Sequence, residues 1–447
     1  MGHKVKMRKS GRKIECNDPQ YHYKRKVWNS HVDRYPSIIF ECKTEADVME
    51  AVKHAKEKGL KISVRSGGFH PAGLAVQDNA VLIDLSNMND IQVDEVSKVA
   101  TIDAGAKISE IDQITQEYGL AIPLGMVSTM GVSGLALGGG LGYLRGMYGL
   151  TSDNIVGVNI VTAAGDLQYV NRFNHAELFW AIRGAGTNFG VVTKFEFQLH
   201  PVGKTILALD VIYDYKDIYP ILKKADQYRR TAIDELSFHF IISNGITAGS
   251  SIPKKGIRLI GMYAGDLNVQ VEEEVIRPLQ ELAKPVLDNT EVMSYVDVQK
   301  KFDSFVREGL GIEGISLFFQ ELSEEALSIL HKEFEKARIP ITIHLLELHG
   351  QVNRISKYDS AFTIRDAGYL LIIEAEIRSH PHQTKQWINR IYKKLLPFSY
   401  NQASYLNSAN NNDEVVQNSY KNIYSRLVAL KKDYDPENLF CSTNNLL

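Results

Sequence analysis

Two glycine-rich segments are the residues of this sequence best suited to bind a ligand through the main chain. The first is Arg65-Ser66-Gly67-Gly68, where the predicted strand 61–65 ends, and the second covers residues 125–149, where nine of 25 residues are glycine. Glycine adopts positive φ and allows close approach, and successive backbone N–H groups form a concavity that binds anions such as a pyrophosphate. Two such loops in one α+β region predict a dinucleotide site.

The spacing of these glycines disfavours a nicotinamide site of the Rossmann type. Gly140, Gly142 and Gly146 miss the GxGxxG pattern by one residue, and they do not lie between a clear strand and helix with an acidic residue about 20 positions further on. A purely structural use of the glycines, in tight turns and close packing, is the alternative interpretation.

The elements that must position these loops alternate between strands and helices. Residues 44–58 are predicted to be a helix with Thr44 as N-cap and Val48, Ala51, Val52 and Ala55 on its buried face. Residues 155–162 and 168–170 predict a hairpin, and 191–199 alternates like an exposed edge strand. The other predicted elements of this part are strands at 36–42, 61–65, 80–85 and 99–103 and helices at about 108–119 and 176–183.

The pattern changes after Pro201, where glycine becomes sparse and strands alternate with longer, charged helices. We therefore expect a domain boundary near residue 203. Strands are predicted at 207–212, 237–242, 257–263 and 369–377, and helices at 268–282 and 323–337.

The length, charge and cysteine content of the chain narrow the classes of function that it could have. With 447 residues the chain is too long for one core, and its formal net charge of -2 gives no electrostatic reason to bind nucleic acid or an anionic membrane. The sequence holds no apolar run that approaches a membrane span and no signal-peptide pattern. Cys16, Cys42 and Cys441 have no CxxC spacing, so neither a metal site nor a disulfide framework is predicted, and a cytoplasmic location is expected.

Several motifs together resemble one family. Residues 64–68 (VRSGG) with 71–76 (PAGLAV) resemble the first flavin loop of the berberine-bridge-enzyme-like FAD-linked oxidases, which belong to the vanillyl-alcohol-oxidase superfamily with its PCMH-type FAD-binding domain. The second loop is similar to residues 131–134 and 138–142. Further matches, in the same order as in the family, are 148–154 (YGLTSDN), 177–184 (ELFWAIRG), 187–193 (TNFGVVT) and 432–440 (KDYDPENLF).

The resemblance implies an α+β fold in three parts. A PCMH-type FAD-binding domain of two subdomains is expected at 33–203, and a substrate-binding domain at 204–400, where helices cover an antiparallel sheet. Residues 401–447 are expected to return to the FAD domain. The resemblance also implies the residues that bind FAD: Arg65, Ser66, Gly67, Gly68, Phe69, His70, Gly131, Val132, Gly134, Gly138, Gly139, Gly142, Asn154, Gly190, Val192 and Asn444.

The chain departs from the family where FAD is often bound covalently. The linking His follows the Gly-Gly pair in many members, but here Phe69 takes that place and His70 follows one residue later. Noncovalent FAD is therefore expected, and a single bond through His70 is the alternative. A second bond through Cys is excluded by the resemblance, because Val127 occupies the Cys position.

The resemblance leaves the catalytic base open. One tyrosine used by alcohol-oxidising members corresponds to Leu141 here, and their Tyr-x-Asn-Tyr segment reads Tyr405-Leu406-Asn407-Ser408. Tyr405 is the candidate catalytic residue, and packing in the core is its structural alternative.

The resulting prediction is an FAD-dependent oxidoreductase. It would remove a hydride from a small alcohol, sugar-like or phenolic substrate and pass electrons to O₂ or another acceptor. The alternative is a flavin-binding structural or assembly protein without catalytic activity. The sequence is also similar to FAD-linked oxidoreductases of spore-forming bacteria, some of them coat-associated, so a spore-coat location is the alternative to the cytoplasm. The oligomeric state is left open.

Overall fold

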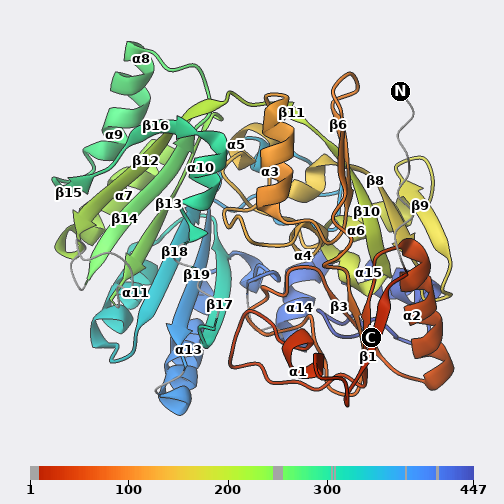
Figure 1. Cartoon of the computed structure of the whole chain (residues 1–447). Coiled ribbons are helices and arrows are strands. Elements are labelled where there is room, and N and C mark those ends of the chain that lie inside the picture. The colour runs from red at the N-terminus through yellow and green to blue at the C-terminus, as the bar shows by residue number, and fades with distance from the viewer. Residues whose placement is uncertain (1–9, 245–254, 304–305, 307–308, 378–379, 409–411) are drawn as a thin grey trace.

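The computed structural model describes residues 10–244, 255–303, 306, 309–377, 380–408 and 412–447. The chain forms two α+β units side by side, one built around smaller sheets and the other around one large antiparallel sheet (Figure 1). The mixed architecture and the antiparallel sheet domain confirm the predicted fold class. None of the helices among the described residues is both long enough and apolar enough to span a membrane.

The first unit begins with a four-stranded sheet in the order β1-β2-β4-β3. Two pairings of this sheet, β2 with β4 and β4 with β3, are parallel, and β1 adds an antiparallel edge strand beside β2. The predicted strands at 36–42, 61–65 and 80–85 are confirmed. The bounds are Arg12–Glu15 for β1, Ile38–Glu41 for β2, Ile62–Arg65 for β3 and Val81–Asp84 for β4.

Helix α2 (Glu45–Lys58) forms as the sequence predicts. Thr44 is its N-cap, and Thr44 and Asp47 form a capping box. The helix ends at Gly59, whose φ of 63° suits the left-handed conformation of a C-terminal cap. Its apolar face, with Val48 and Val52 fully buried, packs into the core of the first unit.

A five-stranded antiparallel sheet in the order β5-β6-β10-β8-β9 completes the first unit. The predicted hairpin is confirmed as β8 paired with β9. The prediction of an edge strand at 191–199 is wrong, because β10 lies in the centre and pairs with β6 and β8. Its alternation reflects one fully buried and one half-buried face rather than a free edge. The bounds are Ile91–Asp94 (β5), Val99–Asp103 (β6), Ile155–Val161 (β8), Leu167–Asn171 (β9) and Val191–Gln198 (β10).

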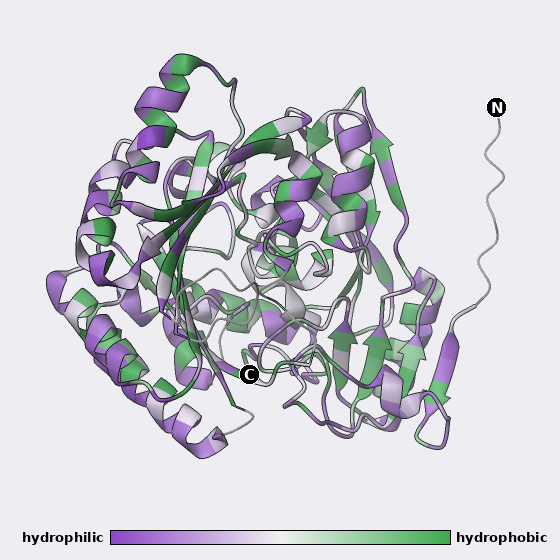
Figure 2. Cartoon of the chain, turned by 60° about the vertical axis from the view of Figure 1, so that its left-hand side comes forward, coloured by the Kyte–Doolittle hydropathy of each residue, from purple (hydrophilic) through white to green (hydrophobic). Residues whose placement is uncertain are grey.

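The second unit contains the large sheet, in the order β15-β12-β14-β13-β18-β19-β17, with β16 also paired to β12. Helices α7, α11 and α13 cover one face and share an apolar core with it, and the other face looks toward the first unit (Figures 1 and 2). The strands are β12 (Thr205–Asp214), β13 (Leu236–Ser243), β14 (Gly256–Tyr263), β15 (Pro285–Asp288), β16 (Glu291–Ser294), β17 (Ile312–Phe319), β18 (Ile341–Glu347) and β19 (Tyr369–Glu376).

The predicted helix at 268–282 is only partly correct. The structure has a short α8 (Val269–Val271), a π-helical turn at Glu272–Ile276 and α9 (Arg277–Gln280). Pro278 lacks an amide proton, so the α-helical ladder cannot pass through it unbroken. The helix predicted at 323–337 is confirmed as α11 (Glu324–Lys336) with Ser323 as N-cap. The other covering helices are α7 (Ile218–Arg229) and α13 (Pro381–Leu395).

Between β11 (His200–Pro201) and β12 the chain passes from the first unit to the second. The last segment returns to the first unit, since Leu427 and Phe440 lie in the same core as α2. Lys431 holds this return in place: its Nζ is fully buried, pairs with Asp435 at 2.6 Å and donates to the carbonyl of Asn188 at 2.8 Å. The helices of this segment are α14 (Asp413–Tyr420) and α15 (Tyr424–Tyr434).

Candidate active site

A cavity of about 370 Å³ lies between the two units. One end is lined by the glycine loops of the first unit together with the C-terminal segment, including Gly67, Gly134 and Asn444. The other end is lined by side chains from the large sheet, including His344 and Glu374. The cavity therefore has one end formed largely by main chain and another formed by side chains.

The two glycine loops touch at one point. A Cβ added to Gly131 would lie 2.3 Å from the Ser66 hydroxyl and 2.5 Å from the amide nitrogen of Gly67, and a Cβ on Gly67 would lie 2.4 Å from the Gly131 nitrogen. Only glycine at both positions permits this approach. Gly134 is different: an added Cβ would meet no protein atom within 4 Å, although the residue lines the cavity.

Backbone N–H groups in the first loop suit a phosphate. No hydrogen bond among the described residues uses the amide of Gly67, Gly68, Phe69 or His70 as its donor. These four residues line the cavity in succession after β3, and Gly68 has a φ of 69°. Consecutive unpaired donors in such a turn form an anion-binding nest. The loop therefore fits the pyrophosphate of a dinucleotide.

Most of the residues predicted to bind the cofactor come together at this end of the cavity. Those that line it are Ser66, Gly67, Gly68, Phe69, His70, Gly131, Gly134, Gly138, Gly190, Val192 and Asn444. They come from four separate parts of the chain, which only the folded structure brings together.

Five other predicted residues lie behind the wall. Arg65 pairs with Asp84 at 2.6 Å, and the side-chain amide of Asn154 donates to the carbonyls of Tyr148 and Leu150. A Cβ on Gly142 would lie 1.6 Å from the carbonyl oxygen of Leu124, so this glycine allows backbone packing. The remaining two are Val132, which begins α4 (Val132–Leu137), and Gly139, which packs against Phe362.

His70 uses both of its ring nitrogens within the protein. Nδ1 accepts from the amide of Ala72 at 3.1 Å, and Nε2 lies 2.9 Å from the carbonyl of Leu406. A ring with this pair of partners is the neutral tautomer with the proton on Nε2. Desolvation lowers the pKa of His70 to about 4, with the Leu406 carbonyl acting against it. His70 therefore links the first glycine loop to the C-terminal segment.

Tyr405 also lines the cavity, with a buried ring that packs edge-on against Phe318 and Phe362. Its hydroxyl accepts from the amide of Gly140 at 3.1 Å and from the side-chain amide of Asn407 at 3.3 Å. Burial raises the pKa of Tyr405, and these two donors only partly offset the effect. The phenol is consequently protonated at neutral pH.

The opposite wall is built by the register of the large sheet. His344 on β18 lies between Ile241 on β13 and Ile372 on β19, and Thr342 lies opposite Glu374. Because side chains alternate along a strand, these residues share the face that looks toward the glycine loops. The imidazole Nε2 of His344 lies 3.7 Å from a carboxylate oxygen of Glu374.

Sequence reasoning missed this acid–imidazole pair. The only signal was the presence of ionisable residues in two largely apolar strands, Glu374 and Glu376 in YLLIIEAE and His344 and Glu347 in ITIHLLE, and nothing in the sequence singles out the pair that faces the cavity. Arg258 on β14 was also missed; it lines the same wall and binds Asp210 through two nitrogens at 2.6 and 2.7 Å.

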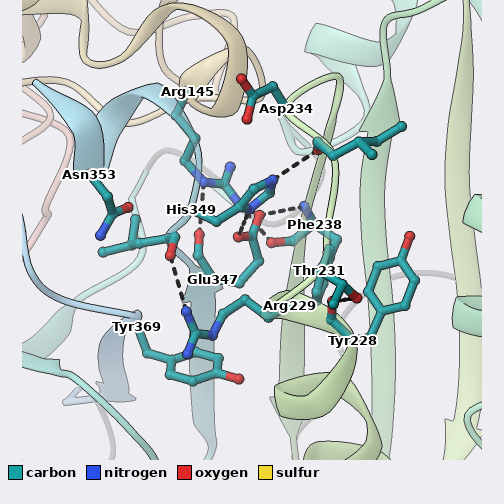
Figure 3. A network of polar contacts seen from close by, with 12 residues as sticks. Arg145, Tyr228, Arg229, Thr231, Asp234, Phe238, Glu347, His349, Asn353 and Tyr369 are labelled. Carbon is teal, nitrogen blue, oxygen red and sulfur yellow. Dashed lines mark hydrogen bonds and ion pairs between the residues drawn. The ribbon is translucent and has the colours of Figure 1, made fainter.

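A buried polar network fixes the second glycine segment to the large sheet (Figure 3). Arg145, in α5 (Arg145–Tyr148), is fully buried, and its guanidinium donates to the carbonyls of Gly142, Phe238 and Glu347. It also pairs with the Glu347 carboxylate at 2.7 Å, and the amide of Phe238 donates to the same oxygen at 3.0 Å. The network thus joins the two units behind the cavity.

The charges in this network support one another. Burial alone would raise the pKa of the Glu347 carboxyl, but the adjacent His349 and Arg145 charges lower it to about 2. His349 lies against the second carboxylate oxygen at 2.5 Å, and this contact raises its pKa despite the burial of the ring. Glu347 therefore carries its charge at neutral pH between the Arg145 guanidinium and the His349 imidazole.

The fold and the cavity define a class of enzyme. Glycine loops with unpaired amides at one end suit a dinucleotide cofactor, and the acid–imidazole pair at the other end lies where a substrate would meet it, as in a cofactor-dependent oxidoreductase. The comparisons identify the family. Residues 36–171 match the model of the FAD binding domain, and residues 404–446 match that of berberine and berberine-like proteins. This chain belongs to the berberine-bridge-enzyme-like family of FAD-linked oxidoreductases.

Individual relatives are similar over nearly the whole chain. An FAD-linked oxidoreductase of Dictyostelium discoideum is 31% identical over 434 residues, 95% of this chain and 92% of that protein. The (R)-6-hydroxynicotine oxidase of Paenarthrobacter nicotinovorans is 32% identical over 435 residues, 94% and 93% of the two chains. The crystal structure of 6-hydroxy-D-nicotine oxidase from Arthrobacter nicotinovorans superposes over 100% of both chains with a TM-score of 0.86 and 27% identity.

Proposed function

We propose that the protein oxidises a small, largely apolar alcohol or phenolic compound, with FAD held noncovalently in the cavity and electrons passed to O₂ or another acceptor. The observation that carries the proposal is the His344–Glu374 pair, which faces the glycine loops across the cavity. Bound FAD supplies the hydride acceptor. The chain itself must bind the substrate, take its hydroxyl proton and keep water away.

Glu374 is the proposed general base. Oxidation of an alcohol releases a hydride from carbon and a proton from oxygen, and the proton goes to a carboxylate oxygen of Glu374. His344, 3.7 Å away, positions this carboxylate. A positioned base contributes roughly 10²- to 10⁴-fold to such a step.

Tyr405 is proposed as a positioning residue rather than as the base. Its raised pKa keeps the phenol protonated at neutral pH, and its oxygen already accepts two hydrogen bonds. The hydroxyl therefore has a proton to donate to a substrate oxygen, which orients the substrate for Glu374.

The substrate end of the cavity favours an aromatic or aliphatic compound over a sugar-like one. A sugar exposes several hydroxyl groups, each of which loses free energy on burial without a partner. Few polar side chains are present beside Glu374, chiefly His344, Arg258 and Thr342. The apolar residues of this wall are Ile241, Phe302, Leu310, Ile312, Leu346, Leu370 and Ile372.

Noncovalent FAD is supported by the state of the first loop. Phe69 has no nucleophilic atom, and both nitrogens of His70 are used, one as acceptor and one as donor. A bond from His70 to the flavin would break one of these contacts. Phe69 instead stacks on Trp28, with ring centroids 6.0 Å apart, and both rings line the cavity.

The division of the chain at 33–203, 204–400 and 401–447 is kept as part of the proposal, with one extension. Strand β1 and Trp28 precede residue 33, yet β1 belongs to the first sheet and Trp28 lines the cavity.

The alternative of a flavin-binding protein without activity rested on the missing tyrosines, and the His344–Glu374 pair supports an enzyme instead.

Two measurements test the proposal. An absorbance spectrum of the purified protein is taken before and after acid precipitation, and we expect a flavin band that moves entirely to the supernatant. Anaerobic mixing with a panel of benzylic alcohols, phenols and oligosaccharides then identifies what bleaches the flavin, and an oxygen electrode tests O₂ as the acceptor. Protein without flavin, or bleaching by oligosaccharides alone, would contradict the proposal.

A further inference from the structure

The second glycine loop is held from outside by the segment that contains α10 (Tyr295–Lys300). The side-chain amide of Gln299 donates to the carbonyl of Gly125 at 3.2 Å, at the cavity wall. Further on, Asp303 accepts from both the amide and the hydroxyl of Ser128, at 2.8 and 2.5 Å. A segment of the second unit therefore positions the flavin loop of the first.

Gln299 has a second partner, the fully buried Asp112 on α3 (Ile108–Glu117). The same side-chain nitrogen donates to Oδ2 of Asp112 at 3.1 Å. The remaining oxygens, Oδ1 of Asp112 and Oε1 of Gln299, are both buried and have no hydrogen-bond partner among the described residues. Two buried acceptors without partners are costly, because each loses its hydration without compensation.

A single proton on Asp112 would give both of these oxygens a hydrogen-bond partner. A protonated carboxyl group donates its O–H, and a primary amide offers one acceptor and two donors. With a proton on Oδ1, Asp112 could donate to Oε1 of Gln299 while it accepts from Nε2, which makes a closed acid–amide pair. The other hydrogen of Nε2 continues to the Gly125 carbonyl.

The surroundings of Asp112 favour the neutral form. Burial raises the pKa of this carboxyl to about 7, and the hydrogen bond from Gln299 only partly opposes it. Tyr295 is the titratable residue of α10 that interacts with Asp112, and its own pKa is raised by burial and by that carboxyl. The charged residues nearby are engaged elsewhere: the Asp297 carboxylate accepts from the hydroxyl of Ser294, the N-cap of α10, and Lys301 pairs with Asp210.

We propose that Asp112 and Gln299 form a proton-dependent positioning pair for the second flavin loop, in which Asp112 holds a proton and its loss loosens the Gly125 main chain and weakens FAD binding. The proposal rests on FAD binding in this cavity and is independent of the substrate.

The first test asks whether Asp112 is protonated. Infrared spectra of the holoprotein are recorded from pH 6 to 8.5, and the carbonyl stretch of a protonated carboxyl group is assigned by its absence in Asp112→Asn. We expect the band at pH 6 and its loss by pH 8.5. A wild-type spectrum without this band at pH 6 overturns the proposal, whatever the variant does.

The second test measures the FAD dissociation constant by fluorescence after reconstitution of the apoprotein. We expect it to rise roughly tenfold in the wild type between pH 6 and 8.5, which is about the size of one lost hydrogen bond between neutral groups. Asp112→Asn should keep the pH 6 value throughout, and Gln299→Leu should already have the weaker value at pH 6.

Gln116→Leu is the matched control, because Gln116 is a buried amide on the same helix that bonds the carbonyls of Leu120 and Val202, away from the cavity. It should keep the wild-type pH dependence. Equal pH dependence in the wild type and in Asp112→Asn overturns the positioning role, even if the infrared band is present. Failure to bind any FAD at any pH would instead count against the proposed function.

Discussion

The two ends of the cavity are built by different means. The end proposed to hold the flavin is lined mainly by backbone: amides of residues 67–70, glycines that touch at Gly67 and Gly131, and the returning C-terminal segment. The end proposed to hold the substrate is lined by side chains that project from separate strands of one sheet, such as Arg258, His344 and Glu374. Backbone recognition suits a cofactor common to many enzymes, whereas interchangeable side chains on a rigid sheet suit a substrate that differs among them.

The comparison is tested most strongly by Glu374→Gln, which should affect only the substrate end. We expect flavin reduction by the substrate to slow by about 10²- to 10⁴-fold, because the base is lost, while the FAD content stays unchanged. Stopped-flow absorbance measures the first and the visible spectrum the second. Glu376→Gln, two residues further on β19 and outside the cavity wall, is the control and should keep the wild-type rate. Equal slowing in both variants would remove Glu374 from the mechanism.

The difference between the two ends of the cavity also explains which parts of the site could be predicted from the sequence. Glycines form contiguous motifs because one loop supplies several N–H groups, so the first loop and the family resemblance could be predicted from neighbouring residues. His344 and Glu374 are 30 positions apart and meet only through the register between β18 and β19. Register depends on the whole sheet, and a Glu in a largely apolar strand carries little information by itself.

Arg65 and Asn154 show that a residue inside a family motif need not line the cavity. Both lie inside family motifs, yet Arg65 pairs with Asp84 and Asn154 bonds nearby carbonyls, behind the cavity wall. A motif records residues that a loop needs in order to fold as well as residues that touch the ligand. Only burial and contacts separate the two uses, and these depend on distant parts of the chain.

The connection between the two ends is tested by Glu347→Gln. This change leaves the buried guanidinium of Arg145 without a counter-charge, so we expect the free energy of unfolding to fall by roughly 3–5 kcal/mol. Urea denaturation at pH 7 measures it. Glu177→Gln removes an exposed ion pair with Arg426 and should cost at most about 1 kcal/mol. A similar small loss in both variants would mean that the network in Figure 3 does not hold the two units together.

The folding stability that this network contributes should also depend on pH. Because the folded state lowers the pKa of Glu347 to about 2, the stability from its charge is present above the carboxyl's ordinary pKa, near 4.3, and is lost as the pH falls toward 2. Glu347→Gln should lack this acid-dependent part of the stability curve.

A smaller effect, confined to the flavin end, is expected for Gly134→Ala. The added methyl group meets no protein atom within 4 Å, and alanine favours the helix α4, so the apoprotein should be as stable as the wild type or slightly more stable. If FAD occupies this space, overpacking by about 1–3 kcal/mol should weaken its binding by roughly 5- to 150-fold. Gly131→Ala is the matched contrast, since its methyl group collides with Ser66 and should reduce apoprotein stability as well. Unchanged FAD affinity in Gly134→Ala would place the cofactor elsewhere.

The smallest effect concerns His70, which joins the first loop to the C-terminal segment. In His70→Leu the carbonyl of Leu406 and the amide of Ala72 lose their partner, so FAD should bind about 1–2 kcal/mol more weakly. Acid precipitation should release all flavin from both proteins; flavin retained in the wild-type pellet but not in the variant would instead prove a covalent bond through His70.

Since the folded state lowers the pKa of His70 to about 4, its neutral form stabilises the protein at neutral pH. That stability is lost as the pH falls from about 6.5 to 4, because the unfolded chain binds the proton first. The variant should lose this slope in a thermal-unfolding series, and an unchanged slope would mean that His70 does not hold the loop.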